Sequence, residues 1–290
     1  MKILISTDTS CLIDYESIKK YEINIFPLNV IVDGEEFLDG ITINQEQLKT
    51  AMRSNKRIST STPPLGEVID YFDGLLKKGY DHIIHFTISS KLSSMNQLFN
   101  NVANEHFKDK VTVIDSYGLS ATMLSHVLFA YDEVSKGTPI NEIVEKIEQR
   151  KINDYIVFIP ENLVALKNGG RISPTIATIG NILGIKPVIN LTDGELKKDT
   201  MVRNIKKTFT DKIDEAIVKF PPEKFDYTFV SFDAIENVLN YIYGYATNKI
   251  GENVINGILP INVCAHCGPG TIGIVVSEKI NGKALSDFIK

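Results

Sequence analysis

The sequence predicts an α/β protein with two domains, a mostly parallel α/β domain over residues 1–153 and an α+β domain over residues 154–290. In the first half, short apolar runs rich in β-branched residues alternate with helical patterns, which is typical of a parallel sheet covered by helices. In the second half, Asp193-Gly194 is a strong hairpin signal between two strand patterns. The regular alternation of strand and helix patterns ends near Asn153-Asp154, and we place the domain boundary there.

Strands in the first half are expected where apolar, β-branched residues cluster. The four runs are Ile3–Ile5, Ile23–Val32, His82–Phe86 and Val111–Ile114. Start and stop signals delimit the helices that lie between and after these runs. The first expected helix follows a capping box of Thr42 and Gln45 and runs through Met52. The second runs from Pro63-Pro64 to Gly79, and the third is capped by Ser93 and runs to His106. The last two are Leu119–Lys136 and a helix from Pro139 to Lys151.

The second half mixes strands and helices without regular alternation. The expected strands are Tyr155–Ile159, Pro187–Leu191, Leu196–Val202, Tyr227–Phe232, Ile255–Leu259 and Thr271–Val276. The expected helices are Pro174–Leu183, Asn204–Phe220 and Ile235–Ile250. The apolar stretch Ile176–Ile185 is expected to be core, with the alternative that it forms the wall of an elongated apolar cavity.

The composition is that of an ordinary globular protein and excludes several classes of function. Of the 290 residues, 43% are hydrophobic and 23% charged, and the net charge is -5, which disfavours nucleic-acid binding. The start of the chain lacks the features of a signal peptide, and no apolar run approaches the roughly 18 residues of a membrane helix. Three cysteines, an odd number, argue against a disulfide framework. We therefore expect a cytoplasmic protein.

Two short motifs near the C-terminus match known patterns without their usual context. Gly268–Gly273 matches the pattern G-x-G-x-x-G. In a dinucleotide-binding site a helix follows this pattern, but here a strand is expected after it. Cys264-Ala-His266-Cys267 contains C-x-x-C but leads into a turn and strand, whereas a redox pair opens a helix. A zinc site needs about four ligands, and we predict no metal site. We interpret both cysteines as small buried thiols beside a ligand pocket.

His266 is the side chain that we expect to contact a ligand, because small residues and a glycine-proline turn surround it. Two hydroxyl-rich segments, Thr60–Thr62 and Ser89–Ser94, fall where helices of the first domain are expected to begin. Ligands of open α/β sheets bind at such places, and helix N-termini favour anions. Taken singly, each segment is better explained as a helix cap. Taken together with His266, they predict a pocket for a small acidic head group.

Asn168-Gly169-Gly170-Arg171 permits two interpretations, which we leave open. The segment is either a helix stop followed by a solvated arginine, or a backbone nest for an anion with a guanidinium beside it.

A hydrolase that uses a serine nucleophile with His266 as its base is the main alternative function. No G-x-S-x-G elbow is present, since Gly118-Leu-Ser120-Ala-Thr122 fails at its last position. The sequence identifies no acidic partner for the histidine.

These segments, in this order, resemble the DegV family of bacterial fatty-acid-binding proteins, called FakB-type subunits in the fatty acid kinase system. The resemblance spans essentially the whole chain. The matching segments are Ser6–Ser10, Thr60–Pro63, Ser89–Ser94, Asp115-Ser116 with Ser120, Leu166–Ser173, Ile185–Ile189 and His266–Gly270.

The resemblance implies two α/β-type domains with the lipid site between them. The family's carboxylate ligands correspond here to Ser61 with Thr60, to Ser93 and to His266, and Arg171 corresponds to a residue that contacts the partner or the phosphoryl group.

The implied role is that of a carrier rather than an enzyme. It would present a long-chain fatty acid to an ATP-dependent fatty acid kinase subunit and pass on acyl-phosphate for phospholipid synthesis. It would need no cofactor and no nucleic acid, and would touch membranes only transiently. A lipid-sensing regulator is a third hypothesis.

Overall fold

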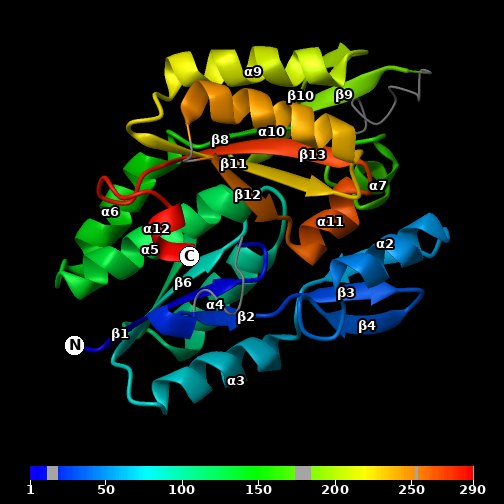
Figure 1. Cartoon of the computed structure of the whole chain (residues 1–290). Helices are drawn as coiled ribbons and strands as arrows, with labels where there is room; N and C mark the ends of the chain where they lie inside the picture. The colour runs from blue at the N-terminus through cyan, green and yellow to red at the C-terminus, as the bar shows by residue number, and fades with distance from the viewer. Residues whose placement is uncertain (12–18, 174–183, 252–253, 290) are drawn as a thin grey trace.

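The computed structural model describes residues 1–11, 19–173, 184–251 and 254–289 (Figure 1). The helix expected over residues 174–183 lies outside these ranges. Within them, no helix is long and apolar enough to cross a membrane.

The first half is built on a four-stranded parallel sheet in the order β2-β1-β6-β7. Its strands are β1 (Ile3–Asp8), β2 (Asn24–Phe26), β6 (His82–Thr87) and β7 (Val111–Asp115). Its helices are α3 (Leu65–Leu76), α4 (Met95–His106), α5 (Ser120–Ser135) and α6 (Ile140–Lys151). Because the strands are parallel, their carboxyl ends meet at one edge, and the Ser89–Ser94 loop follows β6 at that edge.

A second, three-stranded antiparallel sheet in this half was not predicted. Its order is β4-β3-β5, from β4 (Glu35–Leu38), β3 (Asn29–Val32) and β5 (Ile58–Ser61), and α2 (Gln45–Arg53) connects β4 to β5. The expected strand Ile23–Val32 is therefore wrong as one element, because β2 and β3 belong to different sheets. The capping box is also displaced by two residues, to Asn44 and Gln47.

The second half contains a six-stranded mixed sheet in the order β10-β9-β8-β13-β11-β12. Its strands are β8 (Tyr155–Ile159), β9 (Lys186–Thr192), β10 (Glu195–Val202), β11 (Phe225–Phe232), β12 (Val254–Ile258) and β13 (Thr271–Glu278). The predicted hairpin joins β9 to β10. The helices α9 (Ile205–Lys219) and α10 (Glu236–Ile250) cover the outer face of this sheet (Figure 1).

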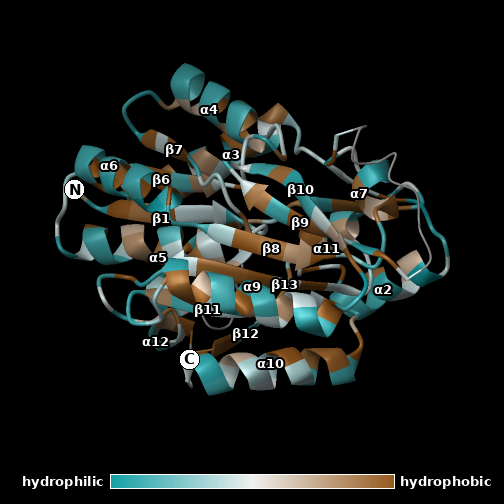
Figure 2. Cartoon of the chain, turned by 90° about the horizontal axis from the view of Figure 1, so that it is seen from above, coloured by the Kyte–Doolittle hydropathy of each residue, from teal (hydrophilic) through white to brown (hydrophobic). Residues whose placement is uncertain are grey.

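The inner face of the six-stranded sheet packs on the first half. Helix α5 lies between the two main sheets, and most of its residues are buried (Figure 1). Leu124 of α5 shares one hydrophobic cluster with Val230 and Val275 of the inner face. Figure 2 shows the hydrophobic colour concentrated on strands such as β8 and β13, and the hydrophilic colour on peripheral helices such as α4 and α6. Along the chain, β7 is the last strand of the four-stranded sheet and β8 is the first strand of the six-stranded sheet. A domain boundary at residue 153 stays a prediction.

Four short elements complete the described chain: the 3₁₀ helix η1 (Lys19–Tyr21), α7 (Val164–Asn168), α11 (Ile261–Cys267) and α12 (Ser286–Ile289). Helix α11 lies between the six-stranded sheet and the small sheet with α2 (Figure 1). This position brings the residues before β13 next to the residues of β5.

Candidate functional site

A pocket opens between the two halves and is largely apolar. Its space, counted with the solvent at its mouth, is about 1040 Å³. The apolar wall combines side chains of both halves: Leu28, Ile88, Met95 and Leu119 from the first, and Ile156, Phe158, Leu191, Leu196, Val230 and Val275 from the second. The polar residues include Thr60, Ser61, Ser93, Arg171, Asn262 and His266.

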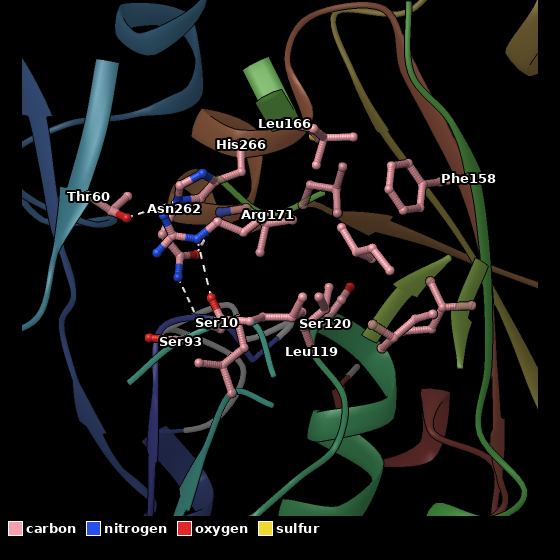
Figure 3. Close-up of a pocket in the computed structure, with 18 of the residues that line it drawn as sticks. Ser10, Thr60, Ser93, Leu119, Ser120, Phe158, Leu166, Arg171, Asn262 and His266 are labelled. Carbon is pink, nitrogen blue, oxygen red and sulfur yellow. Dashed lines mark hydrogen bonds between the residues drawn. The ribbon is translucent and has the colours of Figure 1, made fainter. Parts of the chain in front are cut away.

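Polar groups gather at one end of the pocket, beside the apolar Leu166, while Ser120 lies apart from them where the wall is otherwise mainly apolar. In Figure 3, Thr60, His266, Asn262 and Arg171 lie together, and Phe158 lies away from them. The structure thus brings all five predicted site residues, Thr60, Ser61, Ser93, His266 and Arg171, to the wall of one pocket. Such a pocket suits a ligand with one polar end and a long apolar body.

His266 belongs to a helix that was not predicted. It lies in the last turn of α11, and the turn follows it at Gly268, whose φ is +78°. The Cys264–Cys267 pair therefore ends a helix and, as predicted, leads into a turn and then the strand β13. Both cysteines are buried, and Cys267 lines the pocket, as predicted for small thiols beside a ligand site.

The imidazole of His266 is held in place by a neighbour on each side. Its Nε2 and the Thr60 Oγ1 share a hydrogen bond of 2.9 Å. Its Nδ1 lies against Gly169 and is buried without a hydrogen-bond partner. Burial, and secondarily the positive charge of Arg171, lowers the pKa of His266 to about 4. The ring is therefore neutral at pH 7.

The hydroxyl residues reach the pocket from two different elements. Thr60 and Ser61 belong to β5, although we expected them in a loop. Ser93 lies in the loop before α4, and its Oγ accepts a hydrogen bond of 3.3 Å from the Met95 backbone N–H. Its own hydroxyl proton can still be donated into the pocket, since a serine oxygen both donates and accepts.

Arg171 is half-buried. The expected helix stop is confirmed, since α7 ends at Asn168 with Gly169 as its C-cap, but the solvated arginine and the anion nest need correction. Its guanidinium lines the pocket, where Nε donates to the Leu92 carbonyl oxygen at 3.2 Å and Nη1 donates to the Gly169 carbonyl oxygen, so the side chain is not simply solvated. The backbone N–H groups of residues 169–171 donate to carbonyls of α7 and the residues beside it. They are therefore not free to form an anion nest. Burial lowers the pKa of Arg171, and the group stays charged at pH 7.

Further polar residues of the pocket, including Ser10, Ser120, Asn262 and Thr271, were not among the predicted site residues. The Asn262 Nδ2 donates to the Ser10 Oγ at 2.6 Å, which joins α11 to the end of β1. Asn262 is four residues before His266, one helical turn away. Recognition of α11 as a helix would have revealed it. Ser120 has a φ of +57° at the start of α5 and a buried Oγ without a partner in the described part of the chain. It stands in a segment that resembles the family, but that resemblance assigned it no ligand role.

The geometry disfavours the hydrolase alternative. A catalytic histidine needs a hydrogen bond to its nucleophile and a second group that orients the ring. Here Nε2 bonds to Thr60 and not to a serine, and no described carboxylate contacts Nδ1. In the ranges that the structure covers, no group of three acidic, histidine or cysteine residues could hold a metal ion.

Comparison with known proteins identifies the family. Residues 2–279 match the model of a family described as "Uncharacterised protein, DegV family". A DegV domain-containing protein of Caldanaerobacter subterraneus subsp. tengcongensis is 33% identical over 286 residues, which cover 96% of this chain and 99% of the relative. One from Mycoplasmopsis pulmonis is 28% identical over 274 residues, 94% of each chain.

Several solved structures share the fold. A fatty acid binding DegV family protein from Streptococcus agalactiae has a TM-score of 0.87 at 23% identity, over 96% of this chain and 99% of that one. A stearic acid-binding protein from Eubacterium ventriosum has a TM-score of 0.84 at 23% identity, over 96% and 98% of the two chains. With the family match over almost its full length, this chain belongs to the DegV family.

Proposed function

We propose that this chain binds a long-chain fatty acid in the pocket between its two halves and presents the carboxylate to a partner kinase. The observation that carries the proposal is the division of one pocket into a polar end at His266 and an apolar end at Phe158 (Figure 3). The fold is shared with proteins whose names state that they bind fatty acids, including the stearic acid-binding protein of Eubacterium ventriosum.

The acyl chain would supply most of the affinity. Burial of a methylene group contributes about 0.8 kcal/mol, so a long chain contributes on the order of 10 kcal/mol before the costs of association. A hydrogen bond to a charged head group adds only about 1.5–3 kcal/mol. The inner-face side chains Ile156, Val230 and Val275 would therefore hold the ligand, and the polar end would fix its orientation.

The head-group site would hold the carboxylate with uncharged donors. The hydroxyls of Ser61 and Ser93 can donate to it. The neutral ring of His266 has a single N–H, and because Nδ1 is packed against Gly169, that N–H would be on Nε2 and would be shared between the Thr60 Oγ1 and the carboxylate. Without a tight ion pair, one carboxylate oxygen stays available for further chemistry. That oxygen would form a bond to the terminal phosphorus of ATP as the bond from this phosphorus to ADP breaks.

The kinase would supply the nucleotide and most of the catalytic charge, so we classify this chain as a carrier and not as an enzyme. Arg171 lies at the polar end and would contact the partner or the phosphoryl group. The acyl-phosphate product would pass to phospholipid synthesis, and contact with a membrane would be transient.

Competition binding with a fluorescent fatty acid tests the proposal. We expect Ser93→Ala and His266→Ala each to weaken binding by about tenfold, because each removes one donor to a charged group. Ser90→Ala is the matched control, since Ser90 is exposed in the same loop and uses its backbone N–H to bond Asp115. Wild-type affinity in both pocket variants would refute the head-group assignment.

A further inference from the structure

Helix α11 carries His266 but lacks the usual means of holding itself in place. It has seven residues, and helices of this length are unstable on their own. It begins after Pro260, which has no side-chain group that can cap the free backbone N–H groups of the first turn. Its position must therefore depend on contacts from elsewhere in the chain.

Asp39, which lies 223 residues before Asn262 in the sequence, caps the beginning of α11. Its Oδ2 accepts a hydrogen bond of 3.0 Å from the backbone N–H of Asn262, in the first turn of α11. Asp39 is only 3% exposed and lies directly after β4, at the edge of the small sheet. A carboxylate at this end of a helix is favourable because the helix dipole is positive there.

Burial raises the pKa of Asp39 to about 6. Hydrogen bonds from the backbone of Asn262, the hydroxyl of Thr9 and the backbone of Ile261 act in the opposite direction and lower the pKa, but burial has the larger effect. Burying a carboxylate is costly unless hydrogen bonds compensate for the lost water. The several donors directed at this one side chain are the reason that it can remain in the interior.

The same part of the chain also holds the rest of α11. The Gln45 Nε2 at the start of α2 donates to the Leu259 carbonyl oxygen at 2.5 Å, just before the helix. At the other end of α11, Thr60 of β5 bonds to His266. The small sheet and α2 thus hold α11 at its beginning through Asp39 and at its end through Thr60.

We propose that Asp39 is a positioning residue for the head-group site, which fixes the start of α11 so that His266 meets Thr60 and faces the bound carboxylate. The inference rests on the proposed fatty-acid binding. It differs from a merely structural role in one respect that can be measured: loss of Asp39 should affect the ligand through His266 and not through the pocket as a whole.

A double-mutant cycle tests this difference by fatty-acid competition binding. We expect Asp39→Ala to lower affinity by about tenfold in the wild-type background, as loss of a helix cap would allow. In the His266→Ala background the same change should have an effect of less than about twofold, because the residue that Asp39 positions is already gone. In the Ser93→Ala background the full loss should remain, because Ser93 is not on α11.

Two further variants complete the test. Asp33→Ala is the matched control: Asp33 is an exposed residue beside the same sheet that accepts a backbone hydrogen bond of 2.8 Å from Arg57, and its loss should leave affinity unchanged. Asp39→Asn keeps one acceptor oxygen and should restore affinity to within about threefold of wild type. If Asp39→Ala is too unstable for binding measurements, Asp39→Asn replaces it in the cycle. Its smaller loss of fatty-acid affinity should again be absent in the His266→Ala background.

The outcomes separate this inference from the proposed function. An equal loss of affinity in the wild-type and His266→Ala backgrounds would overturn the positioning role, and so would unchanged affinity in Asp39→Ala. If the wild-type chain bound no fatty acid, the proposed function itself would be wrong.

Discussion

Gly169 and His266 are in direct contact: a Cβ atom on residue 169 would lie 2.3 Å from the His266 Nδ1 and 3.0 Å from its Cε1. Contacts this short do not occur between real atoms, so the imidazole can occupy its place only because residue 169 has no side chain. Gly169 thus makes room for the histidine by close packing, and it does not form an anion nest.

Gly169→Ala should lower fatty-acid affinity by about tenfold, because the methyl group would displace the ring from Thr60 and from the bound carboxylate. Gly169 has an ordinary helical backbone with a φ of -74°, so alanine itself fits the conformation. Competition binding measures the effect, and Gly170→Ala is the matched control. A Cβ there meets nothing within 4 Å, but the φ of +70° strains alanine. This variant should lose about 1 kcal/mol of stability and keep its affinity. The reverse pattern would disprove the role of Gly169.

Arg171→Ala should leave fatty-acid affinity within about threefold of wild type, since the acyl chain supplies most of the binding energy. Its rate of phosphorylation by the proposed partner kinase should fall by about tenfold or more, because a charged hydrogen-bond donor is lost at the proposed site of phosphoryl transfer. Parallel binding and phosphorylation assays check both values, with Lys167→Ala as an exposed control in the same segment. A large loss of lipid binding would instead place Arg171 among the ligand contacts.

Glu133 should make stability depend on pH. Burial alone would raise its pKa, but hydrogen bonds from Lys146, Lys136 and Asn281 lower it to about 2. Because the folded pKa lies below the unfolded value of 4.5, the stabilisation is present above pH 4.5 and is lost as the pH falls towards 2.

Glu133→Gln should therefore lower the free energy of unfolding by about 3 kcal/mol at pH 7 and by much less at pH 3, as urea titrations would measure. Glu142→Gln is the control: its carboxylate also pairs with Lys146, at 2.8 Å, but its side chain is 50% exposed. Its loss should cost less than about 1 kcal/mol. Equal effects of both variants would contradict the account.

The sequence predicted long, regular elements well because periodicity and caps specify them locally. It placed β8 at the residues where the structure has it, and gave α5 and α6 to within a residue or two. The strands β4 and β5 were missed because they have four residues each and are stabilised by pairing with β3, which no local pattern reveals. Likewise, α11 was not predicted, because it has only seven residues and its cap comes from the distant Asp39.

The same limit applies to the site. Hydroxyl segments and one histidine indicated its polar end, and the resemblance to the family selected the residues. The apolar wall could not be located, because Ile156, Val230 and Val275 look like ordinary core residues until two sheets are packed face to face. Asn262 was missed because α11 was not recognised as a helix, and its bond to Ser10 joins residues 252 positions apart.

Native mass spectrometry of the purified chain, followed by extraction and lipid analysis, tests the central claim most directly. The account predicts that each chain carries one long-chain fatty acid, which is released on denaturation and whose retention falls in His266→Ala and Ser93→Ala. A chain that carries no lipid and takes up none when a long-chain fatty acid is added would contradict it.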